Sequence, residues 1–209
     1  MDYSIPNCSI TRAQIAKIIS KYQSQSYKRP KNQLATAKEL LALCPTNIIW
    51  DWGCGTGLST INLAESYPQH TIIGVDQSAH RLAKNPVIQG NYHIQSKKNI
   101  IFVRANIIDL ILNWQGPQAK QQFWLHPNPW PLSKHVKRRW PMHPIFAAAM
   151  NMAETTTMRC NWLSYAQQWH WANTYLGYNS KLEIYQDKAI TAFEIKYQKS
   201  QQTIYQVIC

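Results

Sequence analysis

Residues 46–57, TNIIWDWGCGTG, join a short apolar run to a turn that contains three glycines. A helical pattern, LSTINLAESY (58–67), follows this turn, and a second apolar run, HTIIGVD (70–76), follows the helical pattern. A strand, a glycine turn, a helix and another strand in this order are typical of parallel strands joined by a helical crossover. The stretch therefore predicts an α/β fold.

The same alternation continues along the chain and extends the predicted sheet. We expect a mostly parallel sheet with helices on both faces, and an antiparallel pairing of the last strands at its C-terminal edge. The expected helices cover residues 79–85, 107–114, 144–152 and 162–176, and the expected strands cover 99–105, 121–125, 156–160, 181–186, 193–198 and 203–208.

The N-terminal part differs from the rest of the chain in composition. An amphipathic helix is predicted for 10–22 and a second helix for 34–43, with a polar, proline-containing linker between them. We expect residues 1–33 to form a basic, partly flexible extension and residues 34–209 to form one catalytic domain. The linker carries Lys28, Arg29 and Lys31, which are either a second anchor for a polyanion or a solvated segment.

The charge balance indicates the kind of partner. The chain has 22 Lys and Arg residues against 10 Asp and Glu residues, a formal net charge of +12. The positive electrostatic field of such a charge attracts polyanions. Nucleic acid is the first partner expected, and an anionic membrane surface is the second. No apolar stretch reaches the length of a membrane-spanning helix and no hydrophobic signal region precedes the domain, so a cytoplasmic protein without a membrane partner is expected. The five cysteines include no C-x-x-C pair, and no metal is expected.

The glycine turn indicates a cofactor. Asp51 directly precedes a G-x-G-x-G pattern formed by Gly53, Gly55 and Gly57. Glycines let a ligand approach the main-chain N–H groups closely. The spacing differs from the G-x-G-x-x-G of nicotinamide-binding folds, which makes a dehydrogenase a remote alternative. An acid at Asp51 suits a cofactor with a cationic amino acid portion, such as S-adenosylmethionine.

Two further polar residues follow predicted strands. Asp76 ends the second strand, where a carboxylate accepts hydrogen bonds from ribose hydroxyls. Asn106 follows the third strand, where a side-chain amide is able to pair with the adenine edge. Each also suits a turn or a helix cap, because Asp and Asn favour such positions.

The stretch 123–140, FWLHPNPWPLSKHVKRRW, combines a stiff aromatic loop with a basic block. Its prolines restrict the backbone, so the loop presents Asn128 and Trp130 at little entropic cost. Trp130 either stacks on a base or fills the core beneath the loop. His135 is interpreted as a phosphate or structural contact. The basic side chains expected to neutralise phosphates are Lys134, Lys137, Arg138 and Arg139.

These motifs resemble those of the bacterial tRNA (guanine-N7)-methyltransferases, which are class I enzymes with a Rossmann-like fold. WDWGCGTG with IIGVD is similar to their cofactor-binding half, HPNPWPLSKHVKRR to their Pro-Asp-Pro-Trp-Pro loop, and ITAFE to their C-terminal Thr-x-x-Glu element. The resemblance implies cofactor contacts at Asp51, Asp76, Asn106 and Asn128. It also implies catalytic roles for Asn128 and Trp130, and guanine or tRNA contacts at Asn161, Thr191 and Glu194.

The chain departs from the family pattern at three places. The family has Asp where this chain has Asn128, Lys where it has Leu132, and a Thr-Asp pair where it has Cys160 and Asn161. Replacing a carboxylate by an amide costs about 1 to 3 kcal/mol per recognition contact. The sequence therefore gives more support to S-adenosylmethionine as the cofactor than to guanine as the substrate.

Three functions are consistent with this sequence. The first is methyl transfer from S-adenosylmethionine to N7 of a guanosine in tRNA. The second is a divergent methyltransferase with another substrate, and the third is a catalytically weak RNA-binding paralogue. Nothing distinguishes a monomer from a homodimer.

Overall fold

The computed structural model describes residues 10–23, 34–43, 46–85 and 94–209. The linker residues Lys28, Arg29 and Lys31 lie outside these ranges. The helices are α1 (Arg12–Gln23), α2 (Leu34–Leu43), α3 (Leu58–Ser66), α4 (Ala79–Leu82), α5 (Ile107–Asn113), α6 (Phe146–Met150), α7 (Leu163–Tyr175) and α8 (Ala192–Lys199), with two 3-10 turns, η1 (Ser133–Arg138) and η2 (Trp140–Met142).

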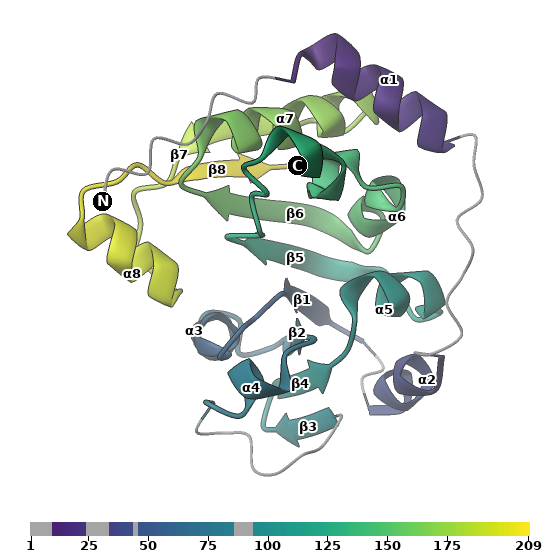
Figure 1. Cartoon of the computed structure of the whole chain (residues 1–209). Coiled ribbons are helices and arrows are strands. Elements are labelled where there is room, and N and C mark those ends of the chain that lie inside the picture. The colour runs from purple at the N-terminus through teal and green to yellow at the C-terminus, as the bar shows by residue number, and fades with distance from the viewer. Residues whose placement is uncertain (1–9, 24–33, 44–45, 86–93) are drawn as a thin grey trace.

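The strands form one sheet (Figure 1). They are β1 (Ile48–Trp52), β2 (Thr71–Asp76), β3 (Ile94–Lys97), β4 (Ile100–Arg104), β5 (Ala119–Leu125), β6 (Ala153–Cys160), β7 (Lys181–Ile184) and β8 (Tyr205–Ile208), in the order β3-β4-β2-β1-β5-β6-β8-β7. The five strands β4, β2, β1, β5 and β6 are parallel, whereas β8 pairs antiparallel with both β6 and β7. The predicted α/β fold with an antiparallel C-terminal edge is thus confirmed. A second antiparallel pair, β3 with β4, was not predicted.

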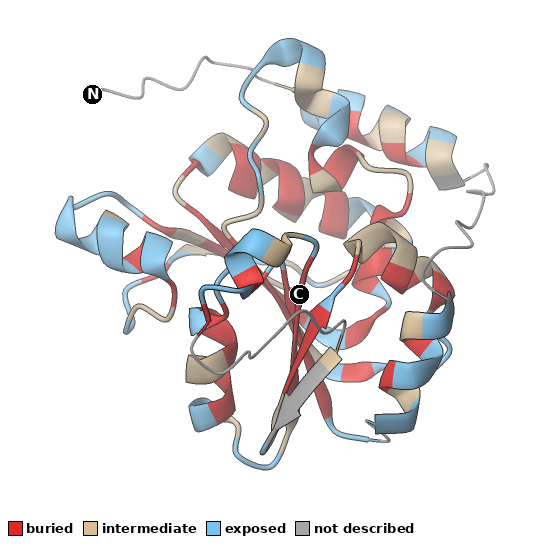
Figure 2. Ribbon diagram, turned by 60° about the horizontal axis from the view of Figure 1, so that its bottom comes forward, coloured by how far each residue is buried: buried red, intermediate tan, exposed pale blue. Residues whose placement is uncertain are grey.

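The two faces of the sheet explain the apolar character of β1. Trp50 and Trp52 lie in the larger core cluster with residues of α5, α6 and α7, while Ile49 lies in a smaller cluster with Leu63 of α3. Successive side chains of a strand point to opposite faces, so a strand covered by helices on both sides is apolar at nearly every position. The exception in β1 is the buried Asp51. Figure 2 shows most of the length of the central strands buried, and β1 is buried at every position.

Helix α1 is part of this core. Ile15 and Ile19 are buried in the cluster that contains Trp169 of α7, and Figure 1 shows α1 lying across α7. Residues 12–23 thus pack onto the domain, and the expected division into 1–33 and 34–209 remains a prediction.

Residues 193–198 form helix α8 rather than the predicted strand. The alternation of Phe193, Ile195 and Tyr197 is a strand pattern, but Thr191 and Glu194 form a capping box that starts a helix. The Thr191 hydroxyl accepts a hydrogen bond from the Glu194 N–H at 2.9 Å, and the Glu194 carboxylate accepts one from the Thr191 N–H at 3.1 Å. This local hydrogen bonding outweighs the alternation.

Candidate active site

The candidate site lies at the edge of the sheet where the parallel strands end. Because β1, β2, β4 and β5 run in the same direction, the residues that follow them meet at one edge. These residues include the glycine turn after β1, Asp76 at the end of β2 and Asn106 after β4. They also include residues 127–131 (PNPWP) after β5, which we call the proline-tryptophan loop. Open α/β sheets bind their ligands at this edge.

The glycine turn has a backbone that only glycine adopts without strain. The φ angles of Gly53, Gly55 and Gly57 are 78°, 61° and 80°. A Cβ atom at Gly53 or Gly55 would meet no atom within 4 Å, whereas one at Gly57 would lie 2.1 Å from Asn85 Nδ2. Gly57 therefore serves packing, while Gly53 and Gly55 leave space beside the main chain for a ligand.

Asp51 lies beneath this turn and is almost fully buried, with 1% of its surface exposed. Its Oδ2 accepts hydrogen bonds from the Ser59 and Thr60 hydroxyls, both at 2.6 Å, while Oδ1 has no partner among the described residues. Burial raises the pKa of Asp51 to about 6, and the two hydroxyl hydrogen bonds limit this rise. A buried carboxylate oxygen without a partner favours a cationic ligand group.

Asp76 connects the glycine turn to the start of α4. Its Oδ2 accepts a hydrogen bond from the Gly55 N–H at 3.0 Å, and its Oδ1 accepts one from the Ser78 N–H at 2.8 Å. Arg81 Nη2 lies 3.3 Å from Oδ1, and about half of the Arg81 side chain is exposed. Asp76 thus supports the turn that would carry the cofactor, and a ribose would share this carboxylate with Arg81.

Asn106 acts as the N-cap of α5. Its Oδ1 accepts hydrogen bonds from the Ile108 and Asp109 N–H groups at 2.9 and 3.3 Å. This cap orients the side chain at the candidate site, and a contact with adenine remains a prediction.

The proline-tryptophan loop is held from below by Arg139. Its Nε donates to the carbonyl oxygens of Pro129 (3.0 Å) and Trp130 (3.3 Å), and Nη1 donates to Gln168 Oε1 at 2.9 Å. The guanidinium also stacks over Trp162 at 4.5 Å. Trp130 has a φ of 47°, a conformation costly for a tryptophan. Arg139 is fully buried and stabilises the loop, and its predicted contact with a phosphate stays a prediction.

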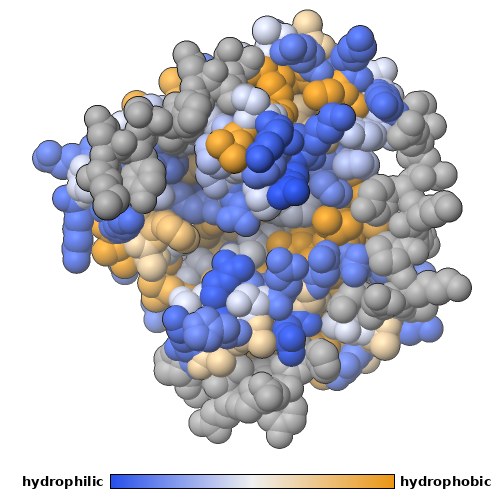
Figure 3. All heavy atoms as spheres, viewed as in Figure 1, coloured by the Kyte–Doolittle hydropathy of each residue, from blue (hydrophilic) through white to orange (hydrophobic). Residues whose placement is uncertain are grey.

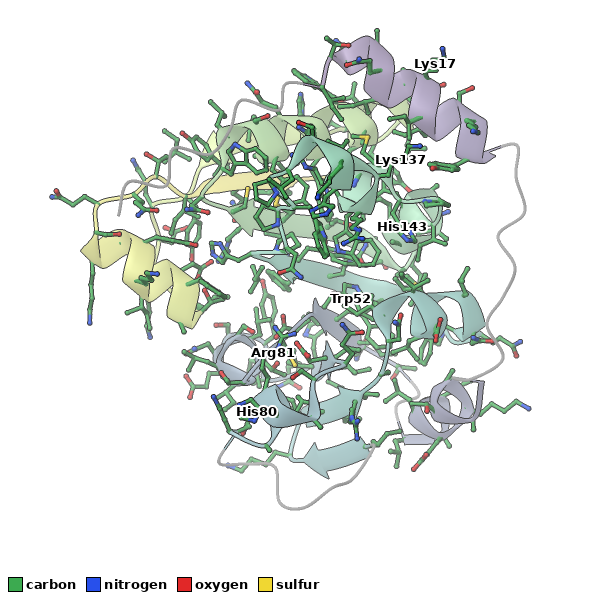
Figure 4. The ribbon with its side chains drawn as sticks, viewed as in Figure 1. Lys17, Trp52, His80, Arg81, Lys137 and His143 are labelled. Atoms are coloured by element: carbon green, nitrogen blue, oxygen red, sulfur yellow. The ribbon has the colours of Figure 1, made fainter. Side chains whose placement is uncertain are left out.

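The outer side of the loop carries the exposed groups. Arg138 lies over the Trp130 ring at 4.9 Å, and the His135 ring meets its edge at 5.5 Å. Asn128, Lys134 and Lys137 are exposed. In the view of Figure 4, Trp52 lies between Lys137 of η1 and Arg81 of α4. Of the two alternatives for Trp130, the structure favours the surface position.

Thr191 and Glu194 do not present free groups to a substrate. Both are buried, and their polar atoms form the capping box of α8. Glu194 also pairs with Arg159 at 3.2 Å, and His126 Nε2 lies 3.8 Å from the same carboxylate. Burial raises the pKa of Glu194, but contacts with His126, the Ile190 N–H and Arg159 outweigh it, so the pKa lies below the ordinary value. Both residues thus have structural roles in α8, and their contacts with guanine or tRNA remain predictions.

Asn161 follows β6 at the same edge of the sheet and donates from Nδ2 to Gln202 Oε1 at 3.0 Å. A contact of Asn161 with a substrate remains a prediction.

Sequence reasoning missed four residues of the site. Ser59 and Thr60 hold Asp51, Arg81 pairs with Asp76, and His126, the first residue after β5, has a φ of 54°. The hydroxyl residues after the glycine turn were a detectable signal, because the first turn of α3 must lie beside the end of β1. The other two depend on contacts that no local pattern encodes.

Within the described ranges, no three His, Cys, Asp or Glu side chains gather as a metal site. No helix of the described part of the chain has both the length and the apolar character needed to cross a bilayer.

Comparisons with known proteins agree with this geometry. A family model described as "Putative methyltransferase" (Methyltransf_4) matches residues 45–207. A trans-aconitate 2-methyltransferase of Deinococcus radiodurans is 47% identical over 111 residues, covering 46% of this chain and 40% of the relative. A tRNA (guanine-N(7)-)-methyltransferase of Mycobacterium ulcerans is 30% identical over 93 residues, covering 44% and 33%. The chain thus spans less than half the length of these two relatives.

A solved structure supports the fold. It is titled as an antibiotic-related methyltransferase and superposes with a TM-score of 0.56 at 14% identity, covering 96% of this chain and 94% of that one. The open space at Gly53 and Gly55 and the unpartnered oxygen of Asp51 fit S-adenosylmethionine, the cofactor predicted from the sequence. The predicted resemblance is confirmed: the chain belongs to the methyltransferase family Methyltransf_4.

Proposed function

We propose that the protein transfers a methyl group from S-adenosylmethionine to N7 of a guanosine in tRNA. The observation that carries this proposal is the exposed loop after β5, where Asn128 and Trp130 lie beside Lys134, Lys137 and Arg138. An aromatic ring with a cation over it, on a loop followed by further exposed cations, suits a nucleotide, because the ring stacks on the base and the cations neutralise phosphates. Several tRNA (guanine-N(7)-)-methyltransferases among the relatives support this substrate.

The cofactor would supply an electrophilic methyl group on a sulfonium. Asp51 would hold its cationic amino group and Asp76 its ribose, while Gly53 and Gly55 give the space for close approach. Guanine N7 carries a lone pair and no proton, so this chain needs no general base. Its contribution is to hold the nucleophile in line with the methyl group.

Asn128 and Trp130 would orient the base. The Asn128 amide offers both a donor and an acceptor, and the Arg139 contacts hold the backbone that presents both side chains. Because Asn128 stands where the family has Asp, its hydrogen bond to the N1–H and N2–H edge is neutral, and a turnover about ten- to a hundredfold below that of a carboxylate loop is expected. Asn128→Asp should therefore raise activity.

Nucleoside analysis tests the proposal. Purified protein is incubated with S-adenosylmethionine and unmodified tRNA, and the tRNA is then digested and separated. The expected product is 7-methylguanosine. No 7-methylguanosine at enzyme concentrations equal to the tRNA would contradict the proposal.

The Deinococcus radiodurans relative favours a second candidate, methylation of a small carboxylic acid. Labelled cofactor incubated with trans-aconitate in place of tRNA distinguishes the two. Label in the acid but none in tRNA would favour this candidate. Cofactor binding without transfer to either acceptor would favour the RNA-binding paralogue.

A further inference from the structure

Helix α8 has one anchored side and one exposed side. Glu194 is fully buried and binds Arg159, and it also accepts hydrogen bonds from the Ile190 and Thr191 N–H groups. In contrast, 54% of the Phe193 side chain is exposed, although Phe is among the most apolar residues. Figure 2 shows most of α8 as exposed ribbon at the periphery of the molecule. The helix thus presents an aromatic ring to solvent on a firmly attached support.

The exposed ring continues an aromatic series that leads to the candidate active site. The Phe193 and Tyr197 rings are stacked, with their centroids 6.1 Å apart and an interplanar angle of 22°. The His126 ring lies 5.7 Å from Phe193 and 5.4 Å from Tyr197. Because His126 directly precedes the loop of Asn128 and Trp130, the series connects α8 with the loop that would orient the target base.

A positive charge lies next to this ring. Lys196 is exposed and follows Phe193 by three residues, which places both on the same side of the helix. Ile195 is also exposed, but two residues along a helix it points to a different side. We call Phe193, Lys196 and Tyr197 the α8 aromatic face. Figure 3 shows hydrophobic and hydrophilic side chains side by side over this face of the molecule.

We propose that the α8 aromatic face binds an unpaired base of RNA close to the nucleotide that is methylated. Phe193 stacks on the base and Lys196 neutralises the adjoining phosphate. Proteins bind single-stranded nucleic acid with such a ring and cation, because the ring stacks on the flat π-surface of any base and the cation pairs with the backbone phosphate. The net charge of +12 favours a polyanion over a neutral partner. The inference rests on the proposed RNA substrate and adds a second stacking position.

Fluorescence anisotropy tests it with a labelled 12-nucleotide single-stranded RNA and the corresponding 12-base-pair duplex. Phe193→Ala should weaken binding of the single strand about tenfold and leave binding of the duplex unchanged. Phe193→Trp should retain or strengthen single-strand binding. Ile195→Ala, which removes an equally exposed apolar side chain from another side of the same helix, is the matched control and should bind like the wild type.

The possible results distinguish failure of the α8 aromatic face from failure of the proposed function. Equal single-strand affinity of the wild type and Phe193→Ala would overturn the aromatic face and leave the proposed function intact. A wild-type protein that binds neither RNA would overturn both. A Phe193→Ala effect without any 7-methylguanosine in tRNA would support the face and reject the proposed reaction. Loss of self-association in place of RNA affinity, seen by sedimentation, would assign the face to a second copy of the chain and overturn the inference.

Discussion

Asp51 combines burial with a carboxylate oxygen that has no hydrogen-bond partner in the described part of the chain. Its pKa of about 6 lies above the ordinary value of 3.8, so the folded protein prefers the neutral acid. A group with a raised pKa stabilises the fold most at low pH, and this contribution is lost as the pH rises through about 6. At neutral pH Asp51 is a buried negative charge, and a bound cationic ligand would lower the free-energy cost of burying it.

Asp51→Asn should therefore separate stability from cofactor binding. We expect the free energy of unfolding at pH 8 to rise by up to about 3 kcal/mol, since a shift of two pKa units costs about this much, and the gain should vanish near pH 4. The affinity for S-adenosylhomocysteine should fall about ten- to a hundredfold. Urea unfolding and calorimetric titration measure both.

Arg138→Ala is the control, and it should change cofactor affinity little while weakening RNA binding. If Asp51→Asn and Arg138→Ala affected the cofactor equally, the division between a cofactor side and an RNA side would be wrong.

Arg139 is a positioning residue whose effect should appear in catalysis. Arg139→Ala removes donors from the Pro129 and Trp130 carbonyl groups and should lower the free energy of unfolding by about 3 kcal/mol. In the folded variant we expect kcat to fall at least tenfold while cofactor affinity stays within about twofold. Steady-state kinetics with tRNA and a cofactor titration provide these values.

Arg139→Lys should restore the charge but little of the activity, because an ammonium cannot serve two carbonyl oxygens and Gln168 while stacking on Trp162. A lysine variant with wild-type kcat would show that charge alone suffices.

Helix α8 depends on one buried ion pair and one capping box. The pKa of Glu194 lies below its ordinary value of 4.5, so its contribution to stability is present above pH 4.5 and is lost as the pH falls further. Glu194→Gln should destabilise the protein by about 3 kcal/mol, because it leaves Arg159 buried without its counter-charge.

Urea unfolding at pH 7 and at a series of pH values below 4.5 checks this expectation. The difference between Glu194→Gln and the wild type should be largest at pH 7 and should shrink steadily as the pH falls below 4.5. The exposed Glu154, which pairs with Lys120 at the other end of the sheet, supplies the control, and Glu154→Gln should cost under 1 kcal/mol. Equal effects of the two substitutions would contradict the structural role of Glu194.

The charge of the whole molecule should govern its RNA affinity. Lys134 and Lys137 are exposed beside the candidate loop. Replacing both by Ala should reduce the slope of log affinity against log salt by about 1.4 to 1.8, if each lysine releases one counterion. The measurement is tRNA binding between 50 and 200 mM salt.

The matched control makes the same charge change elsewhere. Lys120 and Lys181 lie at the starts of β5 and β7, away from the loop, and each already pairs with a neighbouring glutamate. Replacing these two by Ala should leave the slope nearly unchanged. If both double variants lowered the slope of log affinity against log salt equally, the lysines would attract RNA through overall charge and not through a defined binding surface at the loop.

The sequence by itself determined the parallel core and the glycine turn at the candidate cofactor site, because both depend on patterns of residues that are close together in the chain. Apolar runs, a helical period and three glycines after Asp51 follow from local geometry. The tertiary structure decided which of several similar residues serve the site. Arg138 and Arg139 are adjacent and chemically identical, yet one lies over Trp130 at the surface and the other is fully buried beneath the loop.

Long-range contacts made these choices. Arg139 is buried because Gln168 and Trp162, distant in sequence, complete its surroundings. Glu194 is buried beside Arg159 of β6, while the capping box that it forms with Thr191 starts a helix in residues that alternate like a strand. The free energy of burying a charge depends on the partners that the fold brings to it, and spacing along the chain does not specify those partners.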